Sequence, residues 1–175
     1  MYPYLRLVRT LIKGKFKPRL HFSEVSLLPM RVCITDIDPF IELNNGRHLT
    51  MMDFGRYDMA LRMGLLKVIK DHKWGLVVAG SSVRYRHRLK LFQKYQLRSQ
   101  IIAADDKWIY FHQQTIRHGK IHSAALIRTG VTSKKGLVKV EEVLKAMHIE
   151  DAHMPLPEWV KSWAEADELR PWTID

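Results

Sequence analysis

Hydrophobic and polar residues alternate along residues 28–35, which is the period of a strand with one buried face. The strand should end at Asp38-Pro39, because proline disfavours the helical region for the residue before it and donates no backbone hydrogen bond. Asn44 and Asn45 then offer side-chain oxygens to the free N–H groups of a helix start. The pattern predicts a strand, a turn and a helix that runs to about Met63. The apolar members of the strand are Leu28, Met30, Val32 and Ile34.

The predicted helix from Asn44 to Met63 carries apolar residues on more than one side. We therefore expect it to be largely surrounded by protein. Gly55 weakens the helix locally but allows a close approach of a neighbouring segment, as in a helix that lies in a curved sheet. Asp58 and Arg62 stand four residues apart, which predicts a local ion pair on the helix surface.

A period of two dominates the chain after a connecting stretch at 64–75. The turn-forming pairs Asp105-Asp106 and His118-Gly119 separate segments at hairpin spacing, so the strands should pair antiparallel. Together with the first strand this predicts five strands and one buried helix, an α+β fold. The four later strands are expected at 76–89, 95–104, 107–118 and 121–132.

The two ends of the chain differ from the middle. Residues 1–24 form a basic arm without an acid before Glu24, and its apolar residues recur at helical spacing. One possibility is an arm that packs on the domain or frays. The other is an amphipathic segment that lies on an anionic membrane surface. Residues 25–136 form the main domain, and 137–175 are expected to add helices that pack on it.

Composition favours one domain with anionic partners. The chain has 175 residues, 46% of them hydrophobic, which is enough to build a core. Its formal charge of +11 and pI near 9.9 fit nucleic acid, an anionic membrane surface or a phosphorylated cofactor such as coenzyme A. The single cysteine, Cys33, cannot form an internal disulfide, and a reducing cytoplasm fits.

Two carboxylates, Asp36 and Asp38, precede the predicted helix. The start of a helix presents unsatisfied N–H groups and the positive end of its dipole, which can stabilise developing negative charge. Asp and Asn are also common at such junctions for conformational reasons alone. The residues by themselves fit either a reactive site or an ordinary turn with a helix cap.

The stretch from Asp36 to Leu49 resembles the signature D-x-D-x-x-x-H-x-N-N-x-x-Y-L of hot-dog-fold acyl-CoA thioesterases of the 4-hydroxybenzoyl-CoA thioesterase type. The similarity continues in order through residues 30–163. Two positions depart from the signature: Glu42 stands where the family usually has His, and His48 stands where it usually has Tyr.

The resemblance implies a five-stranded antiparallel sheet wrapped around a long central helix, the hot-dog fold. It also implies that Asp38 acts as general base for water or as nucleophile at a thioester carbonyl, while backbone N–H groups around Asn45 and Gly46 hold the carbonyl oxygen. Asp36 is the weaker candidate: alternation places it on the strand face of Asp38, further from the helix. Glu42 either supports the site in place of His or acts on Asp38 as a neighbouring like charge.

A basic run follows the helix, interleaved with aromatic residues. It can hold the phosphates and adenine of coenzyme A, bind RNA, or form a solvated strand face; the motif upstream favours coenzyme A over nucleic acid. We expect no metal, because Gly119-Lys120 between His118 and His122 favours a turn. The expected substrate contacts are Glu42, Asn44, Arg84, Tyr85 and Arg86.

The sequence thus predicts a thioesterase-like hydrolase that cleaves an acyl-CoA or acyl-carrier-protein thioester as a homodimer or tetramer, with no cofactor besides the coenzyme A moiety of its substrate. The alternatives are a hot-dog protein that binds acyl-CoA without catalysis or associates with a membrane surface and, less favoured, an RNA-binding module.

Overall fold

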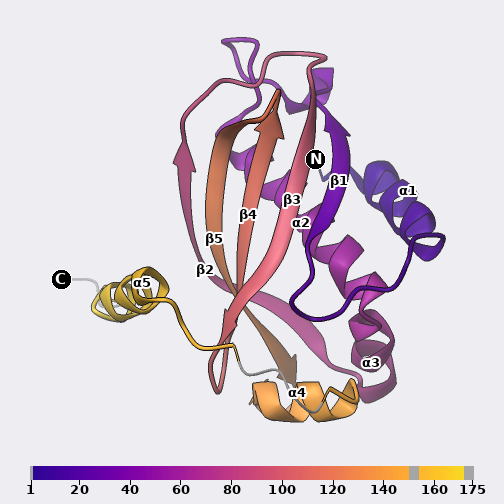
Figure 1. Ribbon diagram of the computed structural model, residues 1–175, viewed down its shortest axis with the longest axis vertical. Coiled ribbons are helices and arrows are strands. Elements are labelled where there is room, and N and C mark those ends of the chain that lie inside the picture. The colour runs from indigo at the N-terminus through magenta and orange to yellow at the C-terminus, as the bar shows by residue number, and fades with distance from the viewer. Residues whose placement is uncertain (1, 150–153, 172–175) are drawn as a thin grey trace.

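The computed structural model describes residues 2–149 and 154–171. Its elements follow one another as the alternation of periods predicts, with additional short helices (Figure 1). The helices are α1 (Tyr4–Lys15), α2 (Asn45–Arg62), α3 (Leu65–His72), α4 (Val140–Ala146) and α5 (Glu158–Glu168), with a 3₁₀ turn η1 (Ile34–Asp36). The strands are β1 (Ser26–Arg31), β2 (Gly75–Tyr85), β3 (Lys94–Ala104), β4 (Ile109–Arg117), β5 (Lys120–Ser133) and β6 (Gly136–Val138).

All strand pairs of the sheet are antiparallel, in the order β1-β3-β4-β5-β2, and the short β6 pairs with the end of β5. Strands β3, β4 and β5 form a meander, whereas β1 and β2 join from elsewhere in the chain and become its two edges (Figure 1). The β4–β5 turn is a two-residue hairpin, since His118 and Gly119 both have positive φ, 49° and 70°.

Helix α2 lies behind the strands in Figure 1 and supplies much of the core. Met51, Met52, Phe54 and Met59 are fully buried, which confirms the expectation that protein surrounds this helix. A Cβ atom added at Gly55 would lie 2.2 Å from Ser99 Oγ, so only glycine permits this approach of the helix to the sheet. The result is a sheet curled around a central helix, the predicted hot-dog arrangement.

Four stretches differ from the expected elements. Strand β2 ends at Tyr85 rather than at residue 89, and β6 is a sixth strand where none was expected. Strand β1 ends at Arg31 rather than at Asp38-Pro39 as expected, because the Asp36 carboxylate accepts a hydrogen bond from the Cys33 N–H (2.9 Å) and closes the turn η1. The expected connection at 64–75 contains α3, which starts after Gly64 in the left-handed conformation (φ 85°).

The basic arm forms α1, which packs on α2. A buried carboxylate holds this packing. Asp58 on α2 is 0% exposed and accepts hydrogen bonds from Lys17 Nζ (3.0 Å), Ser26 Oγ (2.7 Å) and Arg62 Nη1 (3.2 Å). The pair of Asp58 with Arg62 is therefore not the isolated surface pair expected from the sequence, because Asp58 also joins α2 to the end of α1 and to the start of β1.

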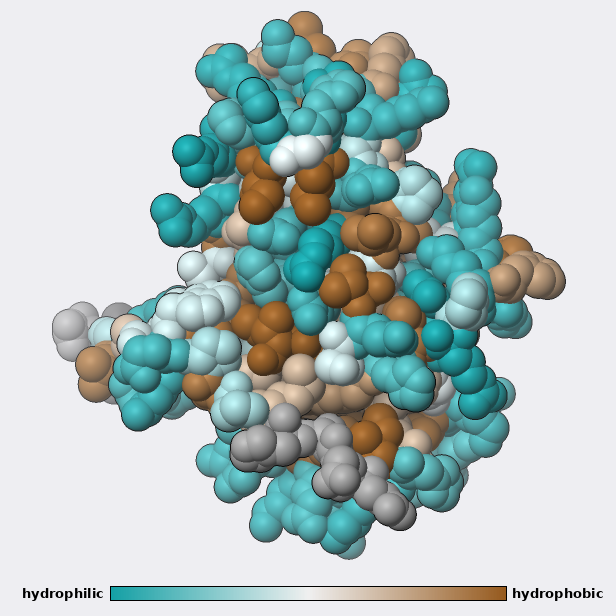
Figure 2. Space-filling view, in the orientation of Figure 1, coloured by the Kyte–Doolittle hydropathy of each residue, from teal (hydrophilic) through white to brown (hydrophobic). Residues whose placement is uncertain are grey.

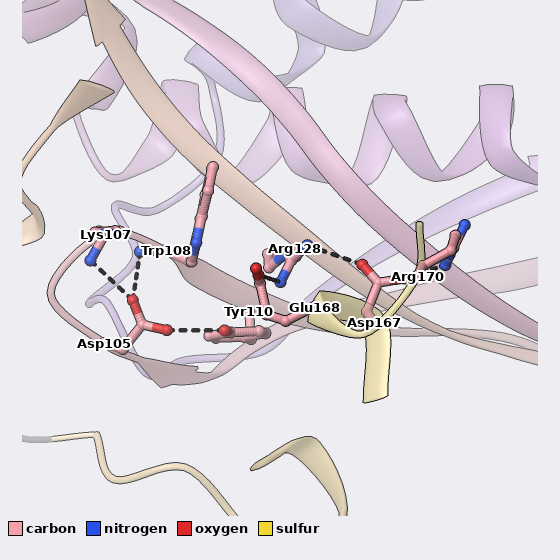
Figure 3. A network of polar contacts seen from close by, with 8 residues as sticks. All are labelled: Asp105, Lys107, Trp108, Tyr110, Arg128, Asp167, Glu168 and Arg170. Atoms are coloured by element: carbon pink, nitrogen blue, oxygen red, sulfur yellow. Dashed lines mark hydrogen bonds and ion pairs between the residues drawn. The ribbon is translucent and has the colours of Figure 1, made fainter. Parts of the chain in front are cut away.

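Helix α5 covers part of the outer face of the sheet, where Tyr110 and Leu126 pack against Val160. Figure 3 shows Arg128 of β5 pointing toward the end of this helix. Its guanidinium pairs with Asp167 (2.8 Å) and Glu168 (3.0 Å) and lies over the Trp108 and Trp163 rings. Residues 150–153 and 172–175 of the expected C-terminal extension lie outside the described residues.

Candidate active site

The residues that carry the motif form a tight reverse turn in front of α2. Ile37 and Leu43 pair as an antiparallel bridge, and the Asp38 N–H donates to the Glu42 carbonyl (2.9 Å). Ile41 has a positive φ of 60°, which lets the chain reverse between these two residues. Asp38 therefore lies directly across the turn from Glu42.

The two oxygens of the half-buried Asp38 carboxylate differ. Oδ1 accepts hydrogen bonds from the N–H groups of Phe40 (2.9 Å) and Glu42 (3.4 Å), so it stabilises the turn. Among the described residues no hydrogen bond or ion pair uses Oδ2. Asp38 is thus a turn residue, as the conformational interpretation holds, and it also keeps one carboxylate oxygen for a ligand or a water molecule.

The start of α2 is capped by Asn44, whose Oδ1 accepts from the N–H groups of Gly46 (2.9 Å) and Arg47 (3.3 Å). The Asn44 N–H itself donates to the Asp36 carbonyl (2.9 Å). Within the part of the chain that the structure describes, the N–H of Asn45 donates to no other group. Of the two backbone donors expected to hold a carbonyl oxygen, that of Asn45 is available, while that of Gly46 is occupied by the cap.

Asp36 does not share a face with Asp38, so the expectation from alternation is wrong. The strand ends before it, and its side chain turns inward, where it is 0% exposed. The Arg6 guanidinium of α1 pairs with its Oδ2, which also accepts from the Cys33 N–H. Asp36 therefore has a structural role, because it connects α1 to the turn below the site.

Glu42, which stands in place of the family His, points its carboxylate at Arg88 (Oε2 to Nε, 3.2 Å). A backbone bridge between Glu42 and Lys90 brings the two segments together. The sequence placed Arg88 within the basic run but gave no sign of this pairing, since the two residues lie far apart along the chain.

Of the expected substrate contacts on β2, Tyr85 reaches the site. Its hydroxyl donates to the Asn45 carbonyl (3.1 Å) at the start of α2. Side chains alternate along a strand, so Arg84 points to the opposite face of the sheet. Arg86 is exposed beyond the end of β2, where its N–H donates to the His122 carbonyl (2.8 Å).

His48, which stands in place of the family Tyr, is buried behind the helix start. Its Nδ1 lies 3.1 Å from Ser123 Oγ, which in turn lies 2.8 Å from Thr115 Oγ1, and its ring meets Tyr85 edge-on at 5.1 Å. Burial, and then the nearby charge of His122, lower the pKa of His48 to about 4. His48 is consequently neutral at pH 7 and packs as an uncharged support below Tyr85.

We expect His48 to make the fold sensitive to acid. Because its pKa falls from an ordinary 6.5 to about 4 on folding, the unfolded chain binds the proton more tightly. Stability is retained above about pH 6.5 and declines as the pH falls toward 4. His48→Gln keeps a polar group near Ser123 but cannot take up a proton. In this variant the urea concentration at the unfolding midpoint should depend less on pH between these two values. An unchanged pH profile would contradict this assignment.

An apolar cavity of about 230 Å³ lies between α2 and the sheet, apart from the motif. It reaches the first residues of β2, whereas Tyr85 at the other end of the same strand contacts Asn45. Eight residues of strand separate Val77 from Tyr85, about 26 Å. Its apolar lining includes Phe22, Leu76, Val77, Val78, Ile101 and Phe111.

Known proteins resemble this chain in sequence and in fold. Protein THEM6 of Drosophila melanogaster is 33% identical over 171 residues, which are 95% of this chain and 86% of that protein. The probable thioesterase YbaW of Escherichia coli superposes with a TM-score of 0.64 at 20% identity, over 70% of this chain and 96% of that one. A hypothetical protein of Staphylococcus aureus in complex with CoA gives 0.64 at 13% identity, over 90% and 99%.

These structural likenesses establish the fold, and the sequence match establishes the family. The family model described as the thioesterase-like superfamily matches residues 32–164, which contain the turn at Asp38, the central helix and all of β2 to β5. The chain belongs to the thioesterase-like superfamily.

Proposed function

We propose that this protein hydrolyses the thioester bond of an acyl-CoA, or of an acyl group on a carrier protein. The observation that carries the proposal is that the two carboxylate oxygens of Asp38 differ. Oδ1 accepts hydrogen bonds that fix the turn, and Oδ2 is available for chemistry. A base fixed in orientation by the backbone suits proton transfer, because little reorganisation is needed at the moment of reaction.

In this mechanism Oδ2 of Asp38 accepts a proton from water while the water oxygen attacks the thioester carbon. Alternatively, Oδ2 itself attacks that carbon. The carbonyl oxygen becomes negative, and the unoccupied N–H of Asn45 at the positive end of α2 stabilises it. Collapse of the tetrahedral intermediate breaks the carbon–sulfur bond, and the leaving thiolate takes up the proton that Asp38 accepted and departs as the thiol. If Asp38 is the nucleophile, water then hydrolyses the anhydride.

Coenzyme A is the proposed carrier because the surroundings of the turn are basic. Arg88 is 74% exposed beside Glu42, and Lys90 follows it. Arg84 on β2 and Arg86 just after it remain candidates for the phosphates, but neither contacts Asn45 in one copy of the chain. The S. aureus neighbour in complex with CoA supports this choice of carrier.

We propose that the working form is a homo-oligomer built on β2. This edge strand is eleven residues long and exposes Leu76 and Val78. Long exposed edges readily pair with another strand. Antiparallel pairing of two copies near Ser81 would set the apolar cavity of one copy beside the Asn45 and Tyr85 of the other, which supplies an acyl site next to Asp38.

We expect light scattering at micromolar concentration to report a dimer or tetramer; a monomer mass contradicts this assembly.

The function is tested by following thiol release from acyl-CoAs of different chain length, with aromatic acyl-CoAs included. Hydrolysis that depends on Asp38 supports the proposal. Saturable acyl-CoA binding without thiol release would favour the second candidate, a non-catalytic binding protein.

A further inference from the structure

One face of helix α1 packs against the protein, and the opposite face is apolar and exposed. The inward face carries Thr10 and Gly14, both buried against α2, where a Cβ at Gly14 would lie 2.9 Å from Leu61 Cδ2. The opposite side carries apolar residues three and four positions apart, so they form one stripe along the helix. They are Leu5 (88% exposed), Val8 (51%), Ile12 (53%) and, just after the helix, Phe16 (85%).

Basic residues border this stripe, and α1 contains no acid. Arg9, Lys13 and Lys15 form no ion pair among the described residues, unlike Arg6 and Lys17, whose partners are Asp36 and Asp58. The outer surface of α1 therefore combines large exposed apolar side chains with uncompensated positive charge.

A basic groove of about 560 Å³ continues this surface between α1 and the edge strand β1. Among the described residues that line it there is no carboxylate. Its basic members include Arg9, Lys13, Arg31 and Lys94, of which Arg31 belongs to β1 and Lys94 begins β3. Figure 1 places α1 beside the β1 edge, and in Figure 2 apolar side chains project among polar ones at this margin of the molecule.

We propose that the outer face of α1 and the groove beside it dock this protein on an anionic phospholipid bilayer. An interfacial helix buries an apolar stripe at the level of the lipid headgroups while its basic flanks attract anionic lipids. No described helix is long and apolar enough to cross a bilayer. In the proposed docking α1 lies along the surface, because its exposed apolar residues form a stripe on one side of the helix.

The charges favour lipid over a second copy of the chain. Two α1 faces brought together would set Arg9, Lys13 and Lys15 of each copy near those of the other with no acid on either helix, and like charges in contact oppose association. An anionic bilayer accepts the stripe and compensates the charge at the same time. The groove offers its basic side chains to lipid phosphates at the edge of the docked surface.

The test is flotation of the purified protein with vesicles of phosphatidylcholine alone or mixed with phosphatidylglycerol. We expect binding at least about tenfold stronger to the anionic vesicles, falling as salt rises, because surface charge attraction is screened. Leu5→Ser/Ile12→Ser should weaken it at least about tenfold through the lost apolar contact. Arg9→Glu/Lys13→Glu should weaken it similarly, through charge.

Matched controls lie away from α1. Leu169→Ser removes an equally exposed apolar side chain, and Lys134→Glu/Lys135→Glu reverses two exposed charges in the β5–β6 turn. Both should bind vesicles like wild type, and thermal melts confirm that every variant folds. Equal affinity for neutral and anionic vesicles, unchanged binding by the Leu5 and Ile12 variant, or an oligomer that this variant dissociates would overturn the proposal. None of these measurements requires turnover.

Discussion

Asp38→Asn should reduce thioester hydrolysis by at least about a hundredfold while the protein remains folded, as expected for loss of a general base. Asparagine keeps Oδ1, which can still accept the N–H groups of Phe40 and Glu42, so the turn survives. The amide that replaces Oδ2 cannot take a proton from water or attack a carbonyl. Initial rates of thiol release, together with a thermal melt, separate the chemical effect from a structural one.

Glu42→His is the matched variant at the facing position of the turn. It restores the usual family residue and removes the carboxylate that pairs with Arg88. Faster hydrolysis would identify Glu42 as a handicap, and slower hydrolysis would give its carboxylate a working role. Identical background thiol release by wild type, Asp38→Asn and Glu42→His across the whole substrate panel would rule out the enzyme and leave ligand binding.

Asp58→Ala should destabilise the fold by about 3–5 kcal/mol, the usual cost of removing one partner from a buried ion pair. The substitution leaves Arg62, Lys17 and the buried Ser26 hydroxyl without their common acceptor. It also opens a gap where α1, α2 and β1 meet. Urea unfolding at neutral pH measures the loss as a shift of the midpoint.

Asp71→Ala is the control for this change. Asp71 pairs with Lys67 on the surface of α3, where both side chains are half exposed or more, so water already solvates the charges. Its removal should leave the midpoint nearly unchanged. An Asp58→Ala protein that unfolds at the wild-type urea concentration would contradict the structural role assigned to the buried carboxylate.

Strict periodicity made much of the fold predictable. Strands β3 and β4 and helix α2 lie within a few residues of their expected positions, because burial of one face or of a whole helix leaves a regular pattern in the sequence. The end of β1 could not be read this way. A side chain, Asp36, stops the strand through the Cys33 N–H, and this local bond overrides the alternation that continues to Thr35.

The candidate site was predictable only where its residues are neighbours in the chain. The turn at Asp38 and the cap at Asn44 follow from local chemistry, and both lie where the motif puts them. The contacts that complete the site join distant residues: Arg6 with Asp36, Arg88 with Glu42, and His48 with Ser123. No spacing marks such pairs, because the sheet curvature and the packing of α1 bring them together.

The order of strands in the sheet also determines how much chain must be gathered before each pair can form. The meander of β3, β4 and β5 is joined by short turns, so its closure costs little conformational entropy. In contrast, β1 can pair only after β3 is made, because Ser26 of β1 pairs with Ser99 of β3 and the whole of α2, α3 and β2 lies between them in the chain. During synthesis α1, β1 and the methionine-rich α2 emerge before any strand that can cover them. The first third of this chain therefore depends on its later strands for burial, and the nascent protein exposes the core side chains of α2 until the meander closes over them.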